Sequence, residues 1–143
     1  MFSLKELCEW TNGVVDSATS IALEEVLFDG IETDTREPLK GKLFVALKGE
    51  TFDGNCFAEA ALKAGAVAAL LDEAAFFQGH ANAIVVRVHD THTALVMLAQ
   101  EWCKKVAPWI VGLTGSVGKT TVKEITSAFL SVSEPTFKTP GNW

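Results

Sequence analysis

A glycine-rich segment near the end of the chain constrains the fold more than any other feature of the sequence. Residues 112–121 read Gly-Leu-Thr-Gly-Ser-Val-Gly-Lys-Thr-Thr. The segment follows an apolar stretch of strand length, Trp109–Leu113, and precedes a helical pattern from Thr121 to Leu130. A strand, a glycine turn and a helix in this order let backbone N–H groups converge on phosphate oxygens at a helix N-terminus. The sequence therefore predicts a phosphate-binding loop in an α/β unit.

The residue types of this loop suit a nucleoside triphosphate with Mg²⁺. Lys119 would reach the β- and γ-phosphates, and the Thr120 hydroxyl would ligate the metal ion. The strict pattern requires glycine five positions before Gly118, where Leu113 stands. The alternative is a glycine-rich turn followed by Lys-Thr by chance. The residues expected to bind the nucleotide are Thr114, Gly115, Ser116, Val117, Gly118, Lys119, Thr120 and Thr121.

The rest of the chain alternates between strand and helix patterns. From residue 43 the expected order is strand, helix, strand, short helix, strand, helix, strand, helix, which indicates an α/β fold with a largely parallel sheet. Near the N-terminus, Ser3-Leu4-Lys5-Glu6 has the form of a capping box, and this helix should end with Gly13 in the left-handed conformation. The further elements expected are strands 26–28, 41–47, 66–71 and 83–88, a helix over 57–63, and a helix capped by Asp90 that runs to residue 105.

A domain boundary is expected at Val106-Ala107-Pro108, because proline interrupts the long helix that precedes it. Residues 1–107 are predicted to form a small α/β domain, and residues 108–143 the start of a second domain. Residues 121–143 are too few for the further strands and the second acidic metal ligand of a P-loop domain. We therefore expect the chain to stop early in its nucleotide-binding domain.

Composition and charge restrict the partners. The 143 residues include 18 Asp+Glu and 12 Lys+Arg, and the net charge of −6 argues against binding nucleic acid or anionic lipid. No apolar run is long enough to span a membrane, and the N-terminus lacks the pattern of a signal peptide. Cys8, Cys56 and Cys103 have neither zinc nor disulfide spacing, so they are predicted to be buried thiols in a reducing cytoplasm.

Two polar segments follow predicted strands, where α/β folds place ligands. In Thr33-Asp34-Thr35-Arg36, the arginine could offer paired donors to a phosphate. Alternatively, Asp34 accepts backbone hydrogen bonds in a turn and Arg36 is solvated. Residues 48–54 form a turn-rich loop that could close over a substrate, or be an ordinary turn around Asp53-Gly54. Phe52 in this loop could stack on a base, although a place in the core is the favoured interpretation.

Several ordered motifs together resemble the Mur ligases, cytoplasmic enzymes that add amino acids to the peptidoglycan precursor. The loop Thr114–Thr120 departs from the strict P-loop pattern as theirs does. The continuation 121–126 and the ending Thr139-Pro140-Gly141-Asn142-Trp143 resemble the members that add D-alanyl-D-alanine. The motifs at 33–36 and 41–54 are similar to the UDP-substrate domain of the same family. The resemblance covers most of residues 31–143.

The resemblance implies an ATP-dependent ligase that joins D-alanyl-D-alanine (D-Ala-D-Ala) to UDP-N-acetylmuramoyl-tripeptide (UDP-MurNAc-tripeptide) through an acyl phosphate. Lys119 would be the catalytic residue, Thr120 would hold Mg²⁺, and Asn142 would join the ATP-binding loop. A monomer is expected. The family's later metal-binding Glu, its carbamylated Lys and its C-terminal domain have no counterpart here, so the 143 residues alone should be inactive. The residues that would contact the UDP substrate are Thr33, Asp34, Thr35, Arg36, Lys48, Gly49, Phe52 and Asp53.

Two other interpretations stay open at this point. The chain could be a non-catalytic module that binds a nucleotide sugar or a partner. It could also be a sibling that adds another amino acid, or a relative such as folylpolyglutamate synthase. The block from Thr33 to Gly54 argues against the folate branch, and Val122-Lys123-Glu124 argues against other Mur members. Separate binding of the UDP compound and of Mg-ATP would discriminate between a ligase and a module.

Overall fold

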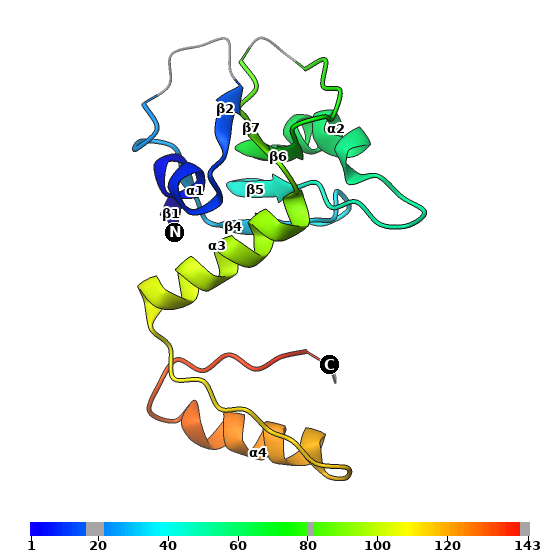
Figure 1. Cartoon of the computed structure of the whole chain (residues 1–143). Coiled ribbons are helices and arrows are strands. Elements are labelled where there is room, and N and C mark those ends of the chain that lie inside the picture. The colour runs from blue at the N-terminus through cyan, green and yellow to red at the C-terminus, as the bar shows by residue number, and fades with distance from the viewer. Residues whose placement is uncertain (17–21, 80–81, 141–143) are drawn as a thin grey trace. The chain divides into compact units, whose positions relative to one another are not determined.

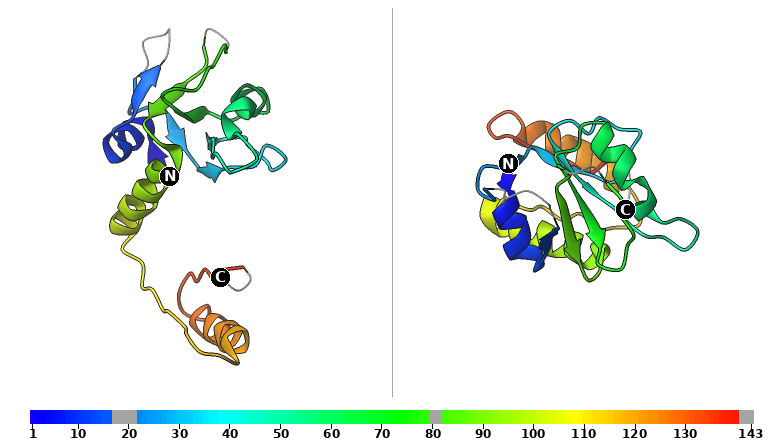
Figure 2. Two further views of the ribbon diagram at one scale, coloured as in Figure 1. Left: turned by 45° about the vertical axis from the view of Figure 1, so that its right-hand side comes forward. Right: turned by 90° about the horizontal axis from the view of Figure 1, so that it is seen from above.

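The computed structural model describes residues 1–16, 22–79 and 82–140 (Figure 1, Figure 2). The chain divides into two compact units, Met1–Ala107 and Pro108–Trp143. Within the described residues, the first unit contains every strand and three of the α-helices, and the second contains one α-helix. The α-helices are α1 (Leu4–Thr11), α2 (Ala58–Lys63), α3 (Thr91–Val106) and α4 (Lys119–Leu130), and a 3-10 helix, η1 (Gly54–Phe57), leads into α2.

A five-stranded sheet forms the centre of the first unit. Its strand order is β2-β7-β6-β5-β4, in which β4, β5, β6 and β7 run parallel and β2 is antiparallel to β7. The predicted largely parallel sheet is therefore confirmed. A separate antiparallel pair joins β1 (Phe2–Ser3) to β3 (Leu27–Phe28). The strands of the main sheet are β2 (Val14–Asp16), β7 (Val85–Val88), β6 (Ala68–Asp72), β5 (Lys42–Val45) and β4 (Gly30–Glu32).

Both faces of this sheet are buried, which is why its central strands read as continuous apolar runs. Along β5, Leu43 and Val45 belong to one apolar cluster and Phe44 belongs to the other. Residues of α1 and α3 complete the first cluster, and residues of α2 complete the second. Helices therefore cover the two faces, and the ends of the strands remain accessible to ligands.

The expected starts of α1 and α3 are confirmed. Glu6 N donates to the Ser3 hydroxyl oxygen (3.2 Å) and Ser3 N donates to Glu6 Oε2 (2.9 Å), which is the predicted capping box. At α3, Thr93 N donates to Asp90 Oδ1 (2.6 Å), so Asp90 is the N-cap. Each cap satisfies N–H groups that the first helical turn leaves without an intrahelical acceptor.

The end of α1 differs from expectation, since Asn12 and not Gly13 takes the left-handed conformation, at φ 55°. Asparagine tolerates this conformation better than most residues with a side chain. Gly13 is needed for another reason. A Cβ at this position would lie 2.5 Å from Val86 Cγ1, so the backbone approaches β7 too closely for a side chain.

The expected short helix between strands 66–71 and 83–88 is wrong. Residues 73–79 and 82–84 form turns and irregular backbone. Glu73 N donates to Val88 O (2.7 Å), and Arg87 Nη1 donates to the carbonyl oxygens of Asp72 and Ala75. These bonds hold residues 72–75 in a turn against β7, and the described chain continues from this turn as irregular backbone.

The expected strand over 109–113 is also absent from the described residues. A strand needs a partner for its hydrogen-bond ladder, and residues 108–140 include no other strand. Trp109 and Ile110 are 100% and 78% exposed. The helix α4 begins at Lys119, two residues before the expected start, and none of its residues is buried.

Two of the three cysteines contradict the expectation of buried thiols. Cys56 and Cys103 are exposed, whereas Cys8 is half-buried, and burial raises the pKa of its thiol. All three are free thiols. Among the residues with described structure, no helix is both long and apolar enough to cross a bilayer.

Candidate functional site

The four parallel strands end on the same side of the sheet, which we call its carboxyl edge. Ligands of open α/β sheets bind outside the carboxyl ends of the strands. Both segments predicted to contact the UDP substrate leave the sheet there. Residues 33–36 follow β4, and residues 48–53 follow β5. Because β4 and β5 are hydrogen-bonded neighbours, the two segments start side by side. The four strands end at Glu32, Val45, Asp72 and Val88.

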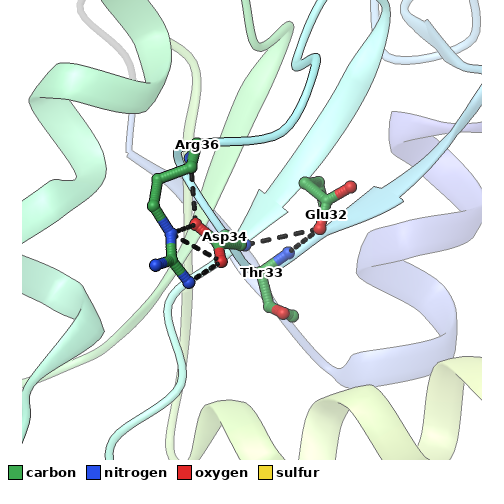
Figure 3. Close-up of polar contacts among 4 residues, drawn as sticks. All are labelled: Glu32, Thr33, Asp34 and Arg36. Atoms are coloured by element: carbon green, nitrogen blue, oxygen red, sulfur yellow. Dashed lines mark hydrogen bonds and ion pairs between the residues drawn. The ribbon is translucent and has the colours of Figure 1, made fainter.

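Glu32 organises the start of the Thr33–Arg36 segment (Figure 3). Its Oε1 accepts hydrogen bonds from the backbone N–H groups of Thr33 (3.0 Å) and Asp34 (3.4 Å), and Lys42 Nζ donates to its Oε2 (3.0 Å). Burial raises the pKa of Glu32, but these three hydrogen bonds outweigh burial and leave the pKa below its usual value. Glu32 therefore stays ionised at neutral pH and holds the segment against the strand.

Arg36 folds back on Asp34 within the same segment (Figure 3). Its Nε lies 2.9 Å and 3.0 Å from the two carboxylate oxygens, and its backbone N–H donates to Asp34 Oδ1 (2.9 Å). The hydrogen bonds from Arg36 lower the pKa of Asp34 to about 2. This is the turn that the sequence offers as an alternative, with an Arg36 side chain that is 87% exposed. A guanidinium has five N–H donors, so the pairing with Asp34 leaves donors for a second anion.

The loop at residues 48–53 is closed at its base by backbone contacts. Gly54 N donates to Leu47 O (2.9 Å), and Lys48 and Asp53 form an isolated antiparallel bridge. A Cβ on Gly54 would lie 2.4 Å from Leu47 O, so only glycine permits this closure. Within the loop, Gly49 N donates to Phe52 O (2.8 Å). The loop projects away from the sheet in both Figure 1 and Figure 2.

Phe52 does not enter the core, so the favoured interpretation of this residue is wrong. The residue is 49% exposed, and neither apolar cluster includes it. Its ring centroid lies 6.0 Å from that of Phe57, which is also exposed. The loop carries Phe52 beyond the sheet edge, away from the two apolar faces. Stacking of Phe52 on a base stays a prediction.

A hydrogen-bond network that the sequence does not predict lies at the base of this loop. Asn55 Nδ2 donates to Asp53 Oδ1 (2.8 Å) and to Asp72 Oδ2 (2.9 Å), and Thr91 N donates to Asp72 Oδ1 (2.9 Å). The backbone N–H of Asn55 is the main cause of the lowered pKa of Asp53. One signal was available in the sequence. Asp72 is the acidic residue that directly follows the predicted apolar strand 66–71, at the edge where ligands of such sheets bind.

In the second unit, the glycine-rich segment leads directly into α4. Gly118 is the N-cap at φ +83°, and Lys119 is the first residue of the helix. Lys119 Nζ donates to Gly115 O, so the ammonium group lies over the loop. A helix N-terminus and an ammonium group together favour an anion. Of the other predicted nucleotide-binding residues, Thr114, Ser116, Val117, Thr120 and Thr121 are exposed, and Asn142 lies outside the described residues.

Comparison with known proteins assigns the chain to a family. Residues 27–102 match the Mur ligase family, catalytic domain. The matched region runs from β3 to α3 and contains residues 33–36 and 48–53, the two segments that follow β4 and β5. The chain therefore belongs to the Mur ligase family.

Within the family, the chain resembles the MurF type. It is 37% identical over 141 residues to UDP-N-acetylmuramoyl-tripeptide--D-alanyl-D-alanine ligase of Bacillus subtilis, covering 99% of the chain and 30% of the relative. It is 41% identical over 140 residues to the Escherichia coli ligase of the same name, covering 98% of the chain and 29% of that relative. The chain thus spans less than a third of these relatives.

Solved structures agree with the sequence comparison. A crystal structure of MurF from Acinetobacter baumannii matches 99% of the chain and 30% of its own length, with a TM-score of 0.79 and 32% identity. The MurF ligase of Thermotoga maritima in complex with ADP matches 82% of the chain and 27% of its own length, with a TM-score of 0.65 and 36% identity. The fold of the chain is therefore that of the corresponding part of MurF ligases.

Proposed function

We propose that the carboxyl edge of the sheet in the first unit binds UDP-MurNAc-tripeptide, and that the loop before α4 binds ATP. In this proposal the chain contributes to an ATP-dependent ligase that adds D-Ala-D-Ala in peptidoglycan precursor synthesis. Residues 1–107 would be the substrate-binding domain, and residues 108–143 the start of the ATP-binding domain. The supporting observation is that residues 33–36 and 48–53 leave neighbouring strands at the ligand-binding edge of a chain related to MurF.

The chemistry of the two edge segments suits a uridine diphosphate. Arg36 and Lys48 supply cations for the diphosphate, and Arg36 can present two N–H groups to one phosphate. The exposed ring of Phe52 offers a face for the uracil. Thr33, Thr35 and the backbone of Gly49 add hydrogen-bonding groups. Asp34 and Asp53 fix the positions of Arg36 and of the loop base, respectively.

The loop of the second unit suits the phosphates of ATP. The ammonium group of Lys119 would neutralise charge on the β- and γ-phosphates, and the N-terminus of α4 would add N–H donors. The Thr120 hydroxyl is an oxygen ligand of the kind that Mg²⁺ accepts. When bound, Mg²⁺ would neutralise charge on the transferring phosphate. A MurF relative solved with ADP supports the nucleotide assignment.

The proposed reaction activates a carboxylate, which is otherwise a poor electrophile. A carboxylate oxygen of the tripeptide attacks the γ-phosphorus of ATP, the bond to the β-phosphate oxygen breaks, and ADP leaves. The amine nitrogen of D-Ala-D-Ala then attacks the carbonyl carbon of the acyl phosphate. The tetrahedral intermediate loses a proton and expels phosphate to give the amide. Such catalysis depends on positioning and charge neutralisation, which Lys119 would provide at the phosphates.

Calorimetry with the 143-residue chain tests this proposal. We expect UDP-MurNAc-tripeptide to bind, and Mg-ATP to bind in a separate titration. Arg36→Ala should weaken binding of the UDP compound by about tenfold or more, because a charge-assisted hydrogen bond contributes roughly 1.5–3 kcal/mol. Lys63→Ala, which removes an exposed cation of α2, is the matched control and should leave the affinity unchanged.

The outcomes separate the competing functions. Binding of the UDP compound without turnover fits a ligase segment that lacks the remaining catalytic groups. Binding of the UDP compound without any affinity for Mg-ATP would favour a non-catalytic nucleotide-sugar module. Failure to bind the UDP compound would overturn the proposal. Amide formation by the chain alone would contradict its expected inactivity.

A further inference from the structure

We infer that Asn55 and Asp72 are positioning residues that hold the loop at residues 48–53 in the arrangement that binds the UDP compound. This inference rests on the proposed function and adds two residues that make no substrate contact in that proposal. Asn55 is a polar residue that is only 8% exposed, and it lies directly after the loop. A buried amide is costly unless its hydrogen-bonding groups are satisfied, so its partners determine what it does.

The side chain of Asn55 joins the end of the loop to the end of β6. Its Nδ2 donates to Asp53 Oδ1 (2.8 Å) and to Asp72 Oδ2 (2.9 Å), while its Oδ1 accepts from Asp72 N (3.2 Å). Both N–H groups and the carbonyl oxygen are therefore in use. Since Asp53 also accepts from Asn55 N (2.9 Å), the last loop residue is bonded twice to the same neighbour.

Asp72 extends this connection to a third and a fourth element. Its Oδ1 accepts from Thr91 N (2.9 Å), at the first residue of α3. The Thr91 hydroxyl donates to Ala46 O (2.7 Å), which directly follows β5, the strand from which the loop departs. The two ends of the loop are thus linked through one carboxylate and one helix start. A network with every member satisfied is rigid, because each bond fixes the orientation of the next.

The position of the network argues for a role in binding beyond stability of the core. It lies at the carboxyl edge of the sheet, directly beneath the loop that carries Lys48, Gly49 and Phe52. Loop residues beyond the base are exposed, so the base is what limits their range of positions. A binding group that is held in place before its ligand arrives loses less entropy on binding. Displacement of the base would therefore weaken affinity in a protein that is still folded.

A reciprocal exchange of side chains tests the inference. In Asn55→Asp, a carboxylate would face the carboxylates of Asp72 and Asp53, and in Asp72→Asn two amide NH₂ groups would face each other. The double variant Asn55→Asp/Asp72→Asn restores one amide opposite one carboxylate and keeps the net charge of the chain. Asn82→Asp makes the same chemical change at an exposed position and serves as the matched control.

Affinity for UDP-MurNAc-tripeptide is measured by calorimetry at a temperature at which circular dichroism shows that each variant is folded. We expect each single variant to bind about tenfold more weakly and Asn82→Asp to bind as the unaltered chain does. The double variant should bind more tightly than Asn55→Asp but not fully recover, because the carboxylate at position 55 still faces Asp53. Hydrogen exchange of the Gly49 and Gly54 amides should accelerate in the single variants and slow again in the double variant.

Single variants that melt at a lower temperature but bind with unchanged affinity when folded would overturn the inference, because they would show a purely structural role. If one single variant does not fold, the affinities of the other single variant and of the double variant for UDP-MurNAc-tripeptide decide the question. Absence of binding by the unaltered chain would instead overturn the proposed function, and the inference with it. The two failures are therefore distinguishable.

Discussion

Gly54 is the residue whose identity the structure explains most directly. A Cβ at this position would lie 2.4 Å from Leu47 O and 2.8 Å from Leu47 N, both of which are backbone atoms. Backbone at the end of a buried strand cannot move aside as a flexible side chain can. The Asp53-Gly54 pair is therefore more than an ordinary turn, since the glycine lets the two ends of the loop meet.

Replacing Gly54 should be costly for the first unit. We expect Gly54→Ala to lower the free energy of unfolding by about 1–3 kcal/mol, the cost of forcing extra atoms into a packed site. Chemical denaturation followed by circular dichroism measures this difference. The control is Gly30→Ala, because a Cβ on Gly30 meets no atom within 4 Å. An equal loss in both variants would show that steric conflict at Leu47 is not the cause.

The Asp34–Arg36 pair gives a prediction about protonation. Arg36 hydrogen bonds lower the pKa of Asp34 to about 2 from the usual 3.8, so the pair stabilises the segment above pH 3.8 and is lost as the pH falls through about 2. In Arg36→Gln, the pKa of Asp34 should return toward 3.8, measured by NMR of the carboxyl carbon. The lowered pKa of Asp53 has other causes, so it should not change in this variant. An unchanged Asp34 titration would contradict the pairing.

At the scale of elements, patterns with a local cause could be predicted from the sequence. The capping box at Ser3 and the cap at Asp90 depend on hydrogen bonds within a few residues. The parallel sheet was predictable because apolar strand patterns alternate with helix patterns along the chain. The sequence predicts Gly13 as the left-handed residue at the end of α1, whereas the structure has Asn12 in this conformation. Gly13 is required by Val86, far away in the sequence, and a contact of that kind leaves no local pattern.

Elements whose hydrogen bonds lie elsewhere in the chain could not be predicted in the same way. A turn takes the place of the short helix expected after β6. Hydrogen bonds from Arg87 Nη1 to Ala75 O and from Glu73 N to Val88 O hold this turn against β7. The short strands Val14–Asp16 and Gly30–Glu32 are not predicted from the sequence, because three residues carry too little periodicity. In the candidate site, the polar segments could be found from sequence, but the link from Asn55 to Asp72 spans 17 positions and requires the fold.

The capping box gives a prediction at this scale. We expect Ser3→Ala to lower the free energy of unfolding of the first unit by about 1 kcal/mol, because the Glu6 N–H loses its acceptor. Thermal unfolding monitored by circular dichroism measures the loss. Ser133→Ala changes an exposed serine in the other unit and should leave the thermal unfolding of the first unit unchanged. A Ser3→Ala variant as stable as the unaltered chain would show that the box contributes nothing to stability.

At the scale of the whole molecule, the proposal assigns different ligands to different units. The residues proposed to bind the UDP compound, at the carboxyl edge of the sheet, all belong to Met1–Ala107. The described residues proposed to bind ATP, in the loop before α4 and at its start, all belong to Pro108–Trp143. The first unit has a packed core on both faces of its sheet, whereas α4 buries none of its residues. The chain spans about 30% of the length of the MurF ligases it matches. We therefore assign the complete reaction to a ligase of that full length and only the two binding sites to this chain.

We therefore expect a mutation in one unit to change the affinity for one ligand and to leave the affinity for the other ligand unchanged. Lys119→Ala should abolish measurable binding of Mg-ATP, because it removes the ammonium group proposed to contact the phosphates. The same variant should bind UDP-MurNAc-tripeptide with unchanged affinity in a parallel calorimetric titration. Lys123→Ala, one turn further along α4, is the control for loss of a cation from this helix. A matching loss of affinity for the UDP compound in Lys119→Ala would show that the two sites are divided wrongly.

An NMR titration of the isotope-labelled chain with UDP-MurNAc-tripeptide, read at the backbone amides, tests most directly whether the carboxyl edge of the sheet binds the UDP substrate. We expect saturable shifts at residues 33–36 and 48–55, at this edge, and little change at residues 112–121. Shifts confined to residues 112–121, or none at saturating ligand, would contradict the claim that this edge holds the UDP substrate.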